Sequence, residues 1–406
     1  MNRALFAGLS GTLAFQNRLD VVGNNIANSN TVGYKEGRVT FQDALYETLE
    51  GGRAGGEAGV GGSNPIQIGS GVSLGGVSVQ HSQGSLERTG QPLDSAITGP
   101  GMFMLSDGQT SLYSRDGSFT LDNTNTLVAG ASGWRVMGWM ANDGSIDSNA
   151  PVSDLTFNIG ELAPPEPTGS AVVRGNLDSQ APENDAFSTT ISIYDSLGEI
   201  HPVELTFTAT DNAGEWTCEA ACGGSTATVT MQFDGNGAVS SGTTLTLDIA
   251  LTNGANSPQQ VEIDLGSLTG LAQASSAVVE SQDGRPPASL VTVAMSDGGI
   301  IEGQYSDGRT RALGQVALAS FTNPGGLGLV GGNLYAEAAA SGPPSIGAAG
   351  TGGRGSVVGR SLEMSNVDLT RSFVDMISTQ RGFQASTRVI ATANEMLDDV
   401  VRLIRV

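Results

Sequence analysis

The chain has 406 residues, of which 58 are Gly, and a formal net charge of −22 at pH 7. This length leaves room for two or three domains, and no run of eighteen apolar residues predicts a membrane-spanning helix. Residues 1–50 and 360–406 are close to neutral, so the acidic charge lies in the middle of the chain. That balance argues against nucleic-acid binding, which requires a basic face. It favours ends that are buried against other copies and a solvated, acidic middle.

The first thirty residues predict an amphipathic helix. Apolar residues recur with alternating steps of four and three, as in a coiled-coil seam. Gly8 and Ser10 interrupt the apolar run, which argues against a cleaved signal peptide. Residues 31–70 are predicted as an Asn- and Gly-rich connecting segment, with a flexible loop from Gly51 to Gly62. The subunit-interface residues expected on this helix are Leu5, Leu9, Leu19 and Ile26.

The middle of the chain predicts antiparallel β domains. Seven Asp-Gly pairs punctuate it, and such a pair between alternating runs signals a hairpin. Pro-rich breaks near 164–167 and 285–287 predict an inserted β domain over 168–283. It would interrupt an outer β domain made of 71–167 and 284–355. The Asp-Gly pairs begin at Asp107, Asp116, Asp143, Asp234, Asp283, Asp297 and Asp307.

Four runs within 203–265 alternate apolar and polar residues, which predicts strands with one face in a core and one in water. The two cysteines, Cys218 and Cys222, lie in this region. If Gly223-Gly224 forms the hairpin turn, both cysteines lie on one strand, too far apart to form a disulfide. A turn at 219–221 would instead bring them face to face. The first reading is favoured, with Cys218 in the core, but the sequence leaves the bridge open.

Residues 356–406 predict a second amphipathic helix with the same alternating steps. Gly382 is its weak position, because Gly in a helix interior costs about 1 kcal/mol relative to Ala. Ser365 or Asn366 could cap its N-terminus. The subunit-interface residues expected on this helix are Phe373, Met376, Phe383, Ile390, Leu397 and Ile404. The fold class is therefore multidomain and mainly β with terminal α, in which antiparallel β domains are nested between N- and C-terminal coiled-coil-like helices.

Catalytic and metal-binding patterns are absent from the sequence, so we expect no catalytic residues, metal or cofactor and no enzyme activity. His81 and His201, the only histidines, are expected to be structural. Asp234 to Gly237 is similar to the opening of a calcium loop. However, Leu245 stands where the loop needs its bidentate Glu, so a β-turn is predicted there.

The two ends carry specific motifs. Residues 19–35 (LDVVGNNIANSNTVGYK), and 365–369 (SNVDL) followed by 380–385 (QRGFQA), are similar to the terminal signatures of the bacterial flagellar rod and hook proteins. Residues 92–103 and 113–119 resemble the entry into that family's first β domain, and 314–324 with 332–335 its return half. The family-motif residues in this chain are Asn24, Asn25, Asn28, Gly33, Asn366, Asp368, Gln380 and Arg381.

The resemblance implies a self-assembling subunit of a helical tube. It implies partners in the rod, the hook cap, the hook–filament junction proteins and the flagellar export apparatus, with no nucleic acid and no membrane insertion. It also implies an extracellular place in the flagellum, reached through the type III channel. The length and inserted domain favour the hook, a flexible joint that transmits torque, over a distal rod subunit. A secreted β-rich adhesin or binding module is a third reading, but it leaves both terminal signatures unexplained. The ends are expected to become ordered on polymerisation.

Overall fold

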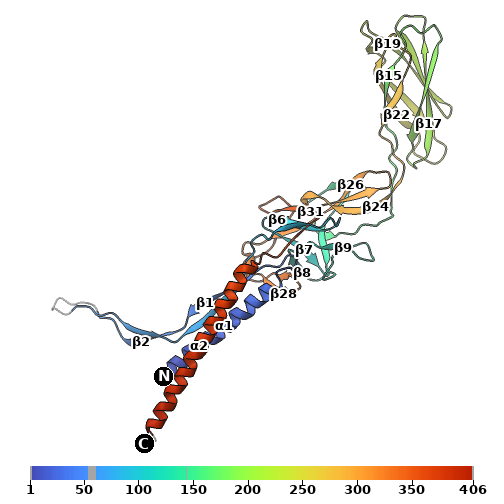
Figure 1. Ribbon diagram of the computed structural model, residues 1–406. Coiled ribbons are helices and arrows are strands. Elements are labelled where there is room, and N and C mark those ends of the chain that lie inside the picture. Colours follow the sequence, from blue (N-terminus) through green and yellow to red (C-terminus); the bar gives the residue numbers. More distant parts are fainter. Residues whose placement is uncertain (1, 54–60, 143, 405–406) are drawn as a thin grey trace. The chain divides into compact units, whose positions relative to one another are not determined.

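The computed structural model describes residues 2–53, 61–142 and 144–404, without the side chains of Asn2, Leu403 and Ile404. Most of the Gly-rich loop predicted at 51–62 lies outside the described residues. The chain forms two compact units (Figure 1). Unit 1 consists of residues 1–157, 293–303 and 310–406, and unit 2 of residues 158–292 and 304–309.

Two long helices lie side by side in unit 1, α1 (Asn2–Ala27) and α2 (Leu369–Ile404) (Figure 1). They run antiparallel, because Gly8 approaches Ile390 whereas Arg18 bonds Asp375. Both helices are formed and paired within one chain, although the sequence suggested ordering only in a polymer. Asp368 Oδ1 accepts the N–H of Arg371 and so caps α2. The predicted caps at residues 365 and 366 were therefore wrong.

The segment predicted as a connection over 31–70 contains strands. Strand β1 (Gly37–Asp43) pairs antiparallel with β4 (Val72–Val79), and β2 (Tyr46–Glu50) pairs with β3 (Ile66–Gly69). The sequence did not reveal the β2–β3 ladder because its large apolar side chains, such as Tyr46 at 53 % exposure and Leu49 at 51 %, are not buried by the chain itself. Main-chain hydrogen bonds therefore hold these strands together.

The β body of unit 1 is one twisted sheet with smaller ladders beside it. The sheet order is β25-β26-β11-β7-β8-β29-β28. Strands β6 and β31 form a separate two-stranded ladder, and so do β5 and β32. Residues 356–363, predicted to belong to the C-terminal helical segment, form β31 and β32 instead. The strand bounds are β5 (Leu86–Arg88), β6 (Ser95–Thr98), β7 (Met102–Ser106), β8 (Ser111–Ser114), β9 (Phe119–Leu121), β10 (Leu127–Ala129), β11 (Arg135–Asn142), β12 (Ser145–Ile146), β13 (Ser153–Asp154), β26 (Thr310–Val316), β27 (Leu318–Ser320), β28 (Gly328–Gly331), β29 (Leu334–Ala336), β30 (Ser345–Gly347), β31 (Ser356–Gly359) and β32 (Ser361–Glu363).

Unit 2 is a two-sheet sandwich. One sheet has the order β21-β22-β15-β23 and the other β16-β17-β18-β19-β20. Strands β24 (Ala288–Met295) and β25 (Ile300–Tyr305) span the division between the units. The remaining bounds are β14 (Leu162–Ala163), β15 (Ser170–Asn176), β16 (Ala186–Tyr194), β17 (Ile200–Ala209), β18 (Glu215–Cys222), β19 (Ser225–Phe233), β20 (Val239–Ser241), β21 (Thr244–Ile249), β22 (Gln259–Thr269) and β23 (Val278–Gln282).

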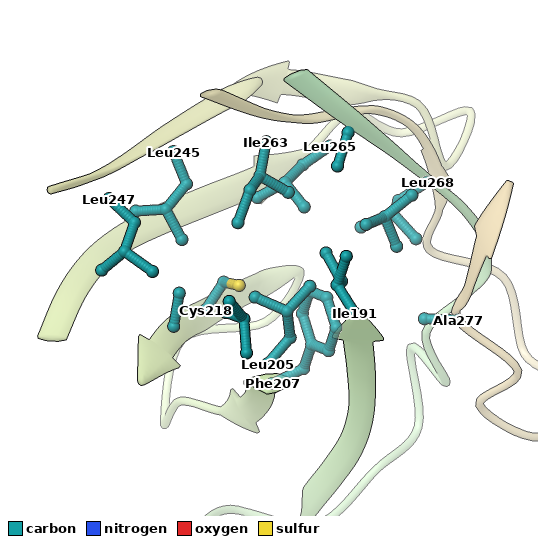
Figure 2. Close-up of a cluster of buried hydrophobic side chains, with 14 of the residues drawn as sticks. Ile191, Leu205, Phe207, Cys218, Leu245, Leu247, Ile263, Leu265, Leu268 and Ala277 are labelled. Atoms are coloured by element: carbon teal, nitrogen blue, oxygen red, sulfur yellow. The ribbon is translucent and has the colours of Figure 1, made fainter. Parts of the chain in front are cut away.

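The core of unit 2 forms between its two sheets. Figure 2 shows Leu205, Phe207 and Cys218 of one sheet pointing toward Leu247 and Ile263 of the other. The predicted alternation is confirmed most clearly over 203–209, 244–249 and 259–265, where every second residue is buried. One pairing differs from the antiparallel expectation, since β15 and β22 run parallel.

The turn predicted at Gly223-Gly224 is present, with positive φ at both glycines, and it joins β18 to β19. Cys218 and Cys222 therefore lie on one strand, both free and buried, as the favoured reading predicted. Burial raises the pKa of the Cys218 thiol to about 12.

Two of the predicted Asp-Gly hairpins are wrong. The strands on either side of Asp116 do not pair with each other, nor do those around Asp283. Asp283 instead accepts the N–H groups of Gly169 and Ser170, so it fastens the start of β15. Asp234 does close a β-turn, accepting the N–H groups of Asn236 and Ala238, as predicted.

Candidate assembly surface and helix junction

Small residues let α1 and α2 approach closely. A Cβ atom at Gly8 would lie 2.8 Å from Cγ1 of Ile390, and one at Gly11 would lie 2.9 Å from Oγ of Ser386. About one turn further along the pair, a Cβ atom at Gly382 would lie 2.6 Å from the ring of Phe15. Gly382, predicted as the weak position of α2, is thus the point where the aromatic ring of Phe15 packs against the helix. Glycine at these points lets the helices approach closely, because a side chain there would press on the partner helix.

The predicted interface residues differ in burial within one chain, and one of them, Ile390, packs on Gly8. Leu5, Leu19, Ile26, Met376, Ile390 and Leu397 are half-buried, while the side chain of Ile404 lies outside the described ones. By contrast, Leu9, Phe373 and Phe383 are exposed at 50 %, 50 % and 36 %.

The outward faces of the helices carry large apolar side chains. On α1, Phe6 is 65 % exposed and Leu13 is 53 % exposed. On α2, Val374 is 62 % exposed and Ile377 is 52 % exposed. Isolated exposed apolar residues are ordinary, but such residues repeated along two paired helices make that surface a candidate for contact with another copy. We name Phe6, Leu9, Leu13, Phe373, Val374 and Ile377 the outer apolar face.

The base of α1 is fastened to the β body by Asn25, which is 2 % exposed. Its amide Nδ2 donates to the carbonyl of Gly37 (2.8 Å), and its Oδ1 accepts the N–H of Gly37 (2.9 Å). The Tyr34 hydroxyl donates to the same oxygen. A buried amide satisfied in this way fixes the direction in which the chain leaves the helix.

The most buried charges of unit 1 meet beside this junction. Glu363 accepts Lys35 Nζ at 2.5 Å and Arg115 at 3.0 Å. The Glu363 side chain is 0 % exposed, that of Lys35 is 0 % and that of Arg115 is 4 %. Gly84 N–H also donates to Glu363. Burial lowers the pKa of Lys35 and of Arg115, while Glu363 opposes that shift in both.

The base of α2 is fastened to the same place. Asn366 Oδ1 accepts the N–H of Glu36 (2.7 Å), and its Nδ2 donates to the carbonyl of Gln80 (2.9 Å). Gly33 has φ +70°, and a Cβ atom there would lie 2.7 Å from the backbone nitrogen of Asp116. Only glycine fits that conformation and that space. The motif residues Asn25, Gly33 and Asn366 are therefore brought together, and Asp368 caps α2 nearby.

The remaining motif residues do not belong to this junction. Asn24 and Asn28 bond each other at the end of α1. Gln380 and Arg381 are exposed on α2.

His81 lies in the same region, and neither of its buried ring nitrogens has a well-formed hydrogen bond to any described residue. Its ring is 5.5 Å from that of Tyr335. Burial, helped by the nearby charges of Lys35 and Arg115, lowers the pKa of His81 to about 4. His81 is therefore a neutral group beside two cations.

Sequence reasoning missed the ion cluster and the glycine contacts. Lys35 is the only lysine of the chain, which could have drawn attention to it. Its partner Glu363, however, lies 328 positions away in the sequence. Within the described residues, no helix is both long enough and apolar enough to span a bilayer.

Three family models match the chain. They are the flagella basal body rod protein family over residues 5–35, the flagellar basal body protein FlaE D2 domain over 163–285, and the flagellar basal body rod FlgEFG protein C-terminal family over 358–403. The terminal matches cover most of α1 and α2, and the central one covers most of unit 2.

Curated relatives match over the whole length. The chain is 35% identical to the flagellar hook protein FlgE of Treponema pallidum, with 100% of both chains covered. It is 32% identical to the flagellar hook protein FlgE of Salmonella typhimurium, covering 97% of this chain and 98% of the relative. It is 30% identical to the flagellar basal-body rod protein FlgG of Bacillus subtilis, with 100% of both covered. The chain therefore belongs to the flagellar hook protein family, whose members are structural subunits of the bacterial flagellum.

Proposed function

We propose that this hook subunit polymerises through the outer apolar face of its two helices into a flexible tube that transmits torque. The observation that carries the proposal is the exposure of that face, with Phe6 at 65 % and Phe373 at 50 %. Helices of a neighbouring copy would cover these side chains. Burying them removes apolar surface from water, which contributes about 25 cal/mol per Å². Contacts between different faces of successive copies generate an open filament.

Unit 2 is suited to the outside of such a tube. Residues 158–292 contain seventeen acidic and two basic side chains, a net charge of −15. Like-charged neighbouring units repel each other, and this disfavours a permanent outer contact. Bending requires neighbouring subunits to move past one another, and weak outer contacts permit that movement.

By resemblance, the further partners are the rod, the hook cap, the hook–filament junction proteins and the export apparatus. The place of the polymer would be outside the cell, reached through the flagellar type III channel. The strongest support for these assignments is the full-length similarity to hook proteins.

Polymerisation of variants tests the interface. Phe373→Asp places a charge in the outer apolar face and should abolish sedimentable polymer after salting out. Leu271→Asp changes a residue of unit 2 with similar exposure, 48 % against 50 %, and should polymerise as the unaltered chain does. Normal polymer from Phe373→Asp would refute the interface. Straight, rigid polymer from the unaltered chain would favour a rod subunit instead of a flexible hook.

A further inference from the structure

The turn between β16 and β17 carries more polar groups than a turn needs. Asp195 Oδ1 accepts the N–H groups of Leu197 (2.8 Å) and Glu199 (2.9 Å). Asp122 and Asp234 close turns in the same way, through the N–H groups two and four residues further on. One carboxylate oxygen is therefore enough to close such a turn, and the surroundings of the second oxygen of Asp195 need another explanation.

That second oxygen is the centre of a cluster. Asp195 Oδ2 lies 3.0 Å from Nε2 of His201 and accepts the Asn253 amide at 2.5 Å. The same amide nitrogen donates to Glu199 Oε2 at 2.6 Å. Asn253 comes from the loop after β21, 58 positions from Asp195 in sequence. The metal-ligating atoms of Asp195, Glu199 and His201 all lie within 4.8 Å of one another.

In the described part of the chain, the two carboxylates of the cluster have His201 and Asn253 as side-chain partners but no Lys or Arg. The Asp195 side chain is 0 % exposed. One neutral amide nitrogen lies between the two carboxylates, in the position where a cation would be held. A buried carboxylate is ordinarily paired with a cation or coordinates a metal.

We propose that Asp195, Glu199 and His201 form a binding site for a divalent transition-metal cation of the Zn²⁺ class. The cation would take the place of the Asn253 amide, whose side chain would turn away. One imidazole with two carboxylates is a donor set that Zn²⁺ accepts, whereas Mg²⁺ and Ca²⁺ prefer oxygen ligands alone. Oδ1 of Asp195 would stay on its two N–H groups and hold the carboxylate in place.

The position of the turn gives this site a mechanical consequence. Gly198, within the same turn, has φ +83°, and a Cβ atom there would lie 2.5 Å from Cδ of Pro287 and 3.2 Å from Cβ of Pro165. Pro165 and Pro287 belong to the two segments by which the chain enters and leaves the sandwich. A cation held by Asp195, Glu199 and His201 would therefore stiffen this turn where the two connections of unit 2 pass it.

Titration calorimetry with ZnCl₂ on the purified full-length chain, freed of metal with a chelator, tests the site. The unaltered chain should bind one Zn²⁺, and His201→Ala and Glu199→Gln should each bind it at least about tenfold more weakly. MgCl₂ should not compete. Absence of saturation up to about 1 mM Zn²⁺, unchanged binding by His201→Ala, or equal binding of Mg²⁺ would overturn the proposal.

A substitution at Asn253 separates a metal site from a purely hydrogen-bonded cluster. Asn253→Asp replaces the donating amide by a third carboxylate, so it should bind Zn²⁺ more tightly and gain thermal stability when Zn²⁺ is added. Asp234→Asn is the control, because Asp234 closes the same kind of turn without a neighbouring histidine. It should leave Zn²⁺ affinity unchanged. Loss of stability in Asn253→Asp that Zn²⁺ does not restore would contradict the proposal, and fluorescence of the buried Trp216 reports whether unit 2 is folded.

Discussion

Replacing Glu363 by Gln should destabilise unit 1 strongly. Glu363 accepts Lys35 at 2.5 Å, Gly84 N–H at 2.8 Å and Arg115 at 3.0 Å, and its side chain is fully buried. Gln keeps the shape but removes the charge and turns one oxygen into an N–H₂ donor, so two buried cations lose their counter-charge. Breaking a buried ion pair from one side costs about 3–5 kcal/mol. That is a large part of the 5–15 kcal/mol typical of a domain.

Urea unfolding of the full-length chain measures this loss. Trp216 lies in unit 2, whereas Trp134 and Trp139 lie in unit 1. In a Trp216→Phe background, the fluorescence transition therefore reports unit 1. We expect Glu363→Gln to lower the free energy of unfolding of unit 1 by about 3–5 kcal/mol.

Two further variants make the result decisive. Asp154→Asn breaks an exposed pair with Arg135, whose side chains are 36 % and 49 % exposed, and should cost less than about 1 kcal/mol. Adding Lys35→Met to Glu363→Gln removes one unpaired cation and should recover part of the loss. A Glu363→Gln chain within about 1 kcal/mol of the unaltered protein would refute the reasoning that this cluster holds the junction together.

Other consequences of the structure can be measured in the same way. Gly382→Ala should loosen the helix pair, because the added methyl group presses on Phe15. Gly23→Ala, where an added Cβ would have no atom within 4 Å, should instead gain up to about 1 kcal/mol of helix stability. Circular dichroism of the helices on heating compares the two variants, and equal effects would contradict the close-packing argument. The pKa of His81 is lowered from 6.5 to about 4, so its contribution to stability is fully present above pH 6.5 and is lost as the pH falls to about 4. His81→Phe should flatten the pH dependence of stability in that window by roughly 2–3 kcal/mol relative to the unaltered chain, and an unchanged pH profile would count against the buried neutral imidazole. Deleting residues 168–283 should leave polymer that bends differently under the electron microscope; complete loss of assembly would show that unit 2 is needed for the polymer to form.

The alternation of apolar and polar residues predicted the strands of unit 2 well, because each sheet there has one face in the core and one face in water. Val203, Leu205 and Phe207 alternate in sequence and are all fully buried. The Gly223-Gly224 turn was predictable for a similar reason, since only glycine adopts its positive φ at both positions without strain. Such features depend on neighbours in sequence.

The junction and the helix seam depend on partners far away in the chain. No residue near Lys35 in sequence indicates that its ammonium group will bind Glu363. Likewise, Gly382 is expected to weaken the helix until the contact with Phe15 is known. The same limit applies to the exposed strands β2 and β3, whose pairing leaves their apolar side chains uncovered. Periodicity also selected Ile390 as a contact between subunits, whereas it packs on Gly8 within one chain. An Ile390→Asp variant would therefore disturb the helix pair before it tests the polymer.

The most direct test of the central claim is cryo-electron microscopy of the polymer formed by the purified chain on salting out. The account predicts a curved, flexible tube in which α1 and α2 lie innermost and the outer apolar face, including Phe6 and Phe373, is covered by helices of neighbouring copies. A tube in which these side chains remain exposed to solvent, or one held together through unit 2 alone, would contradict it.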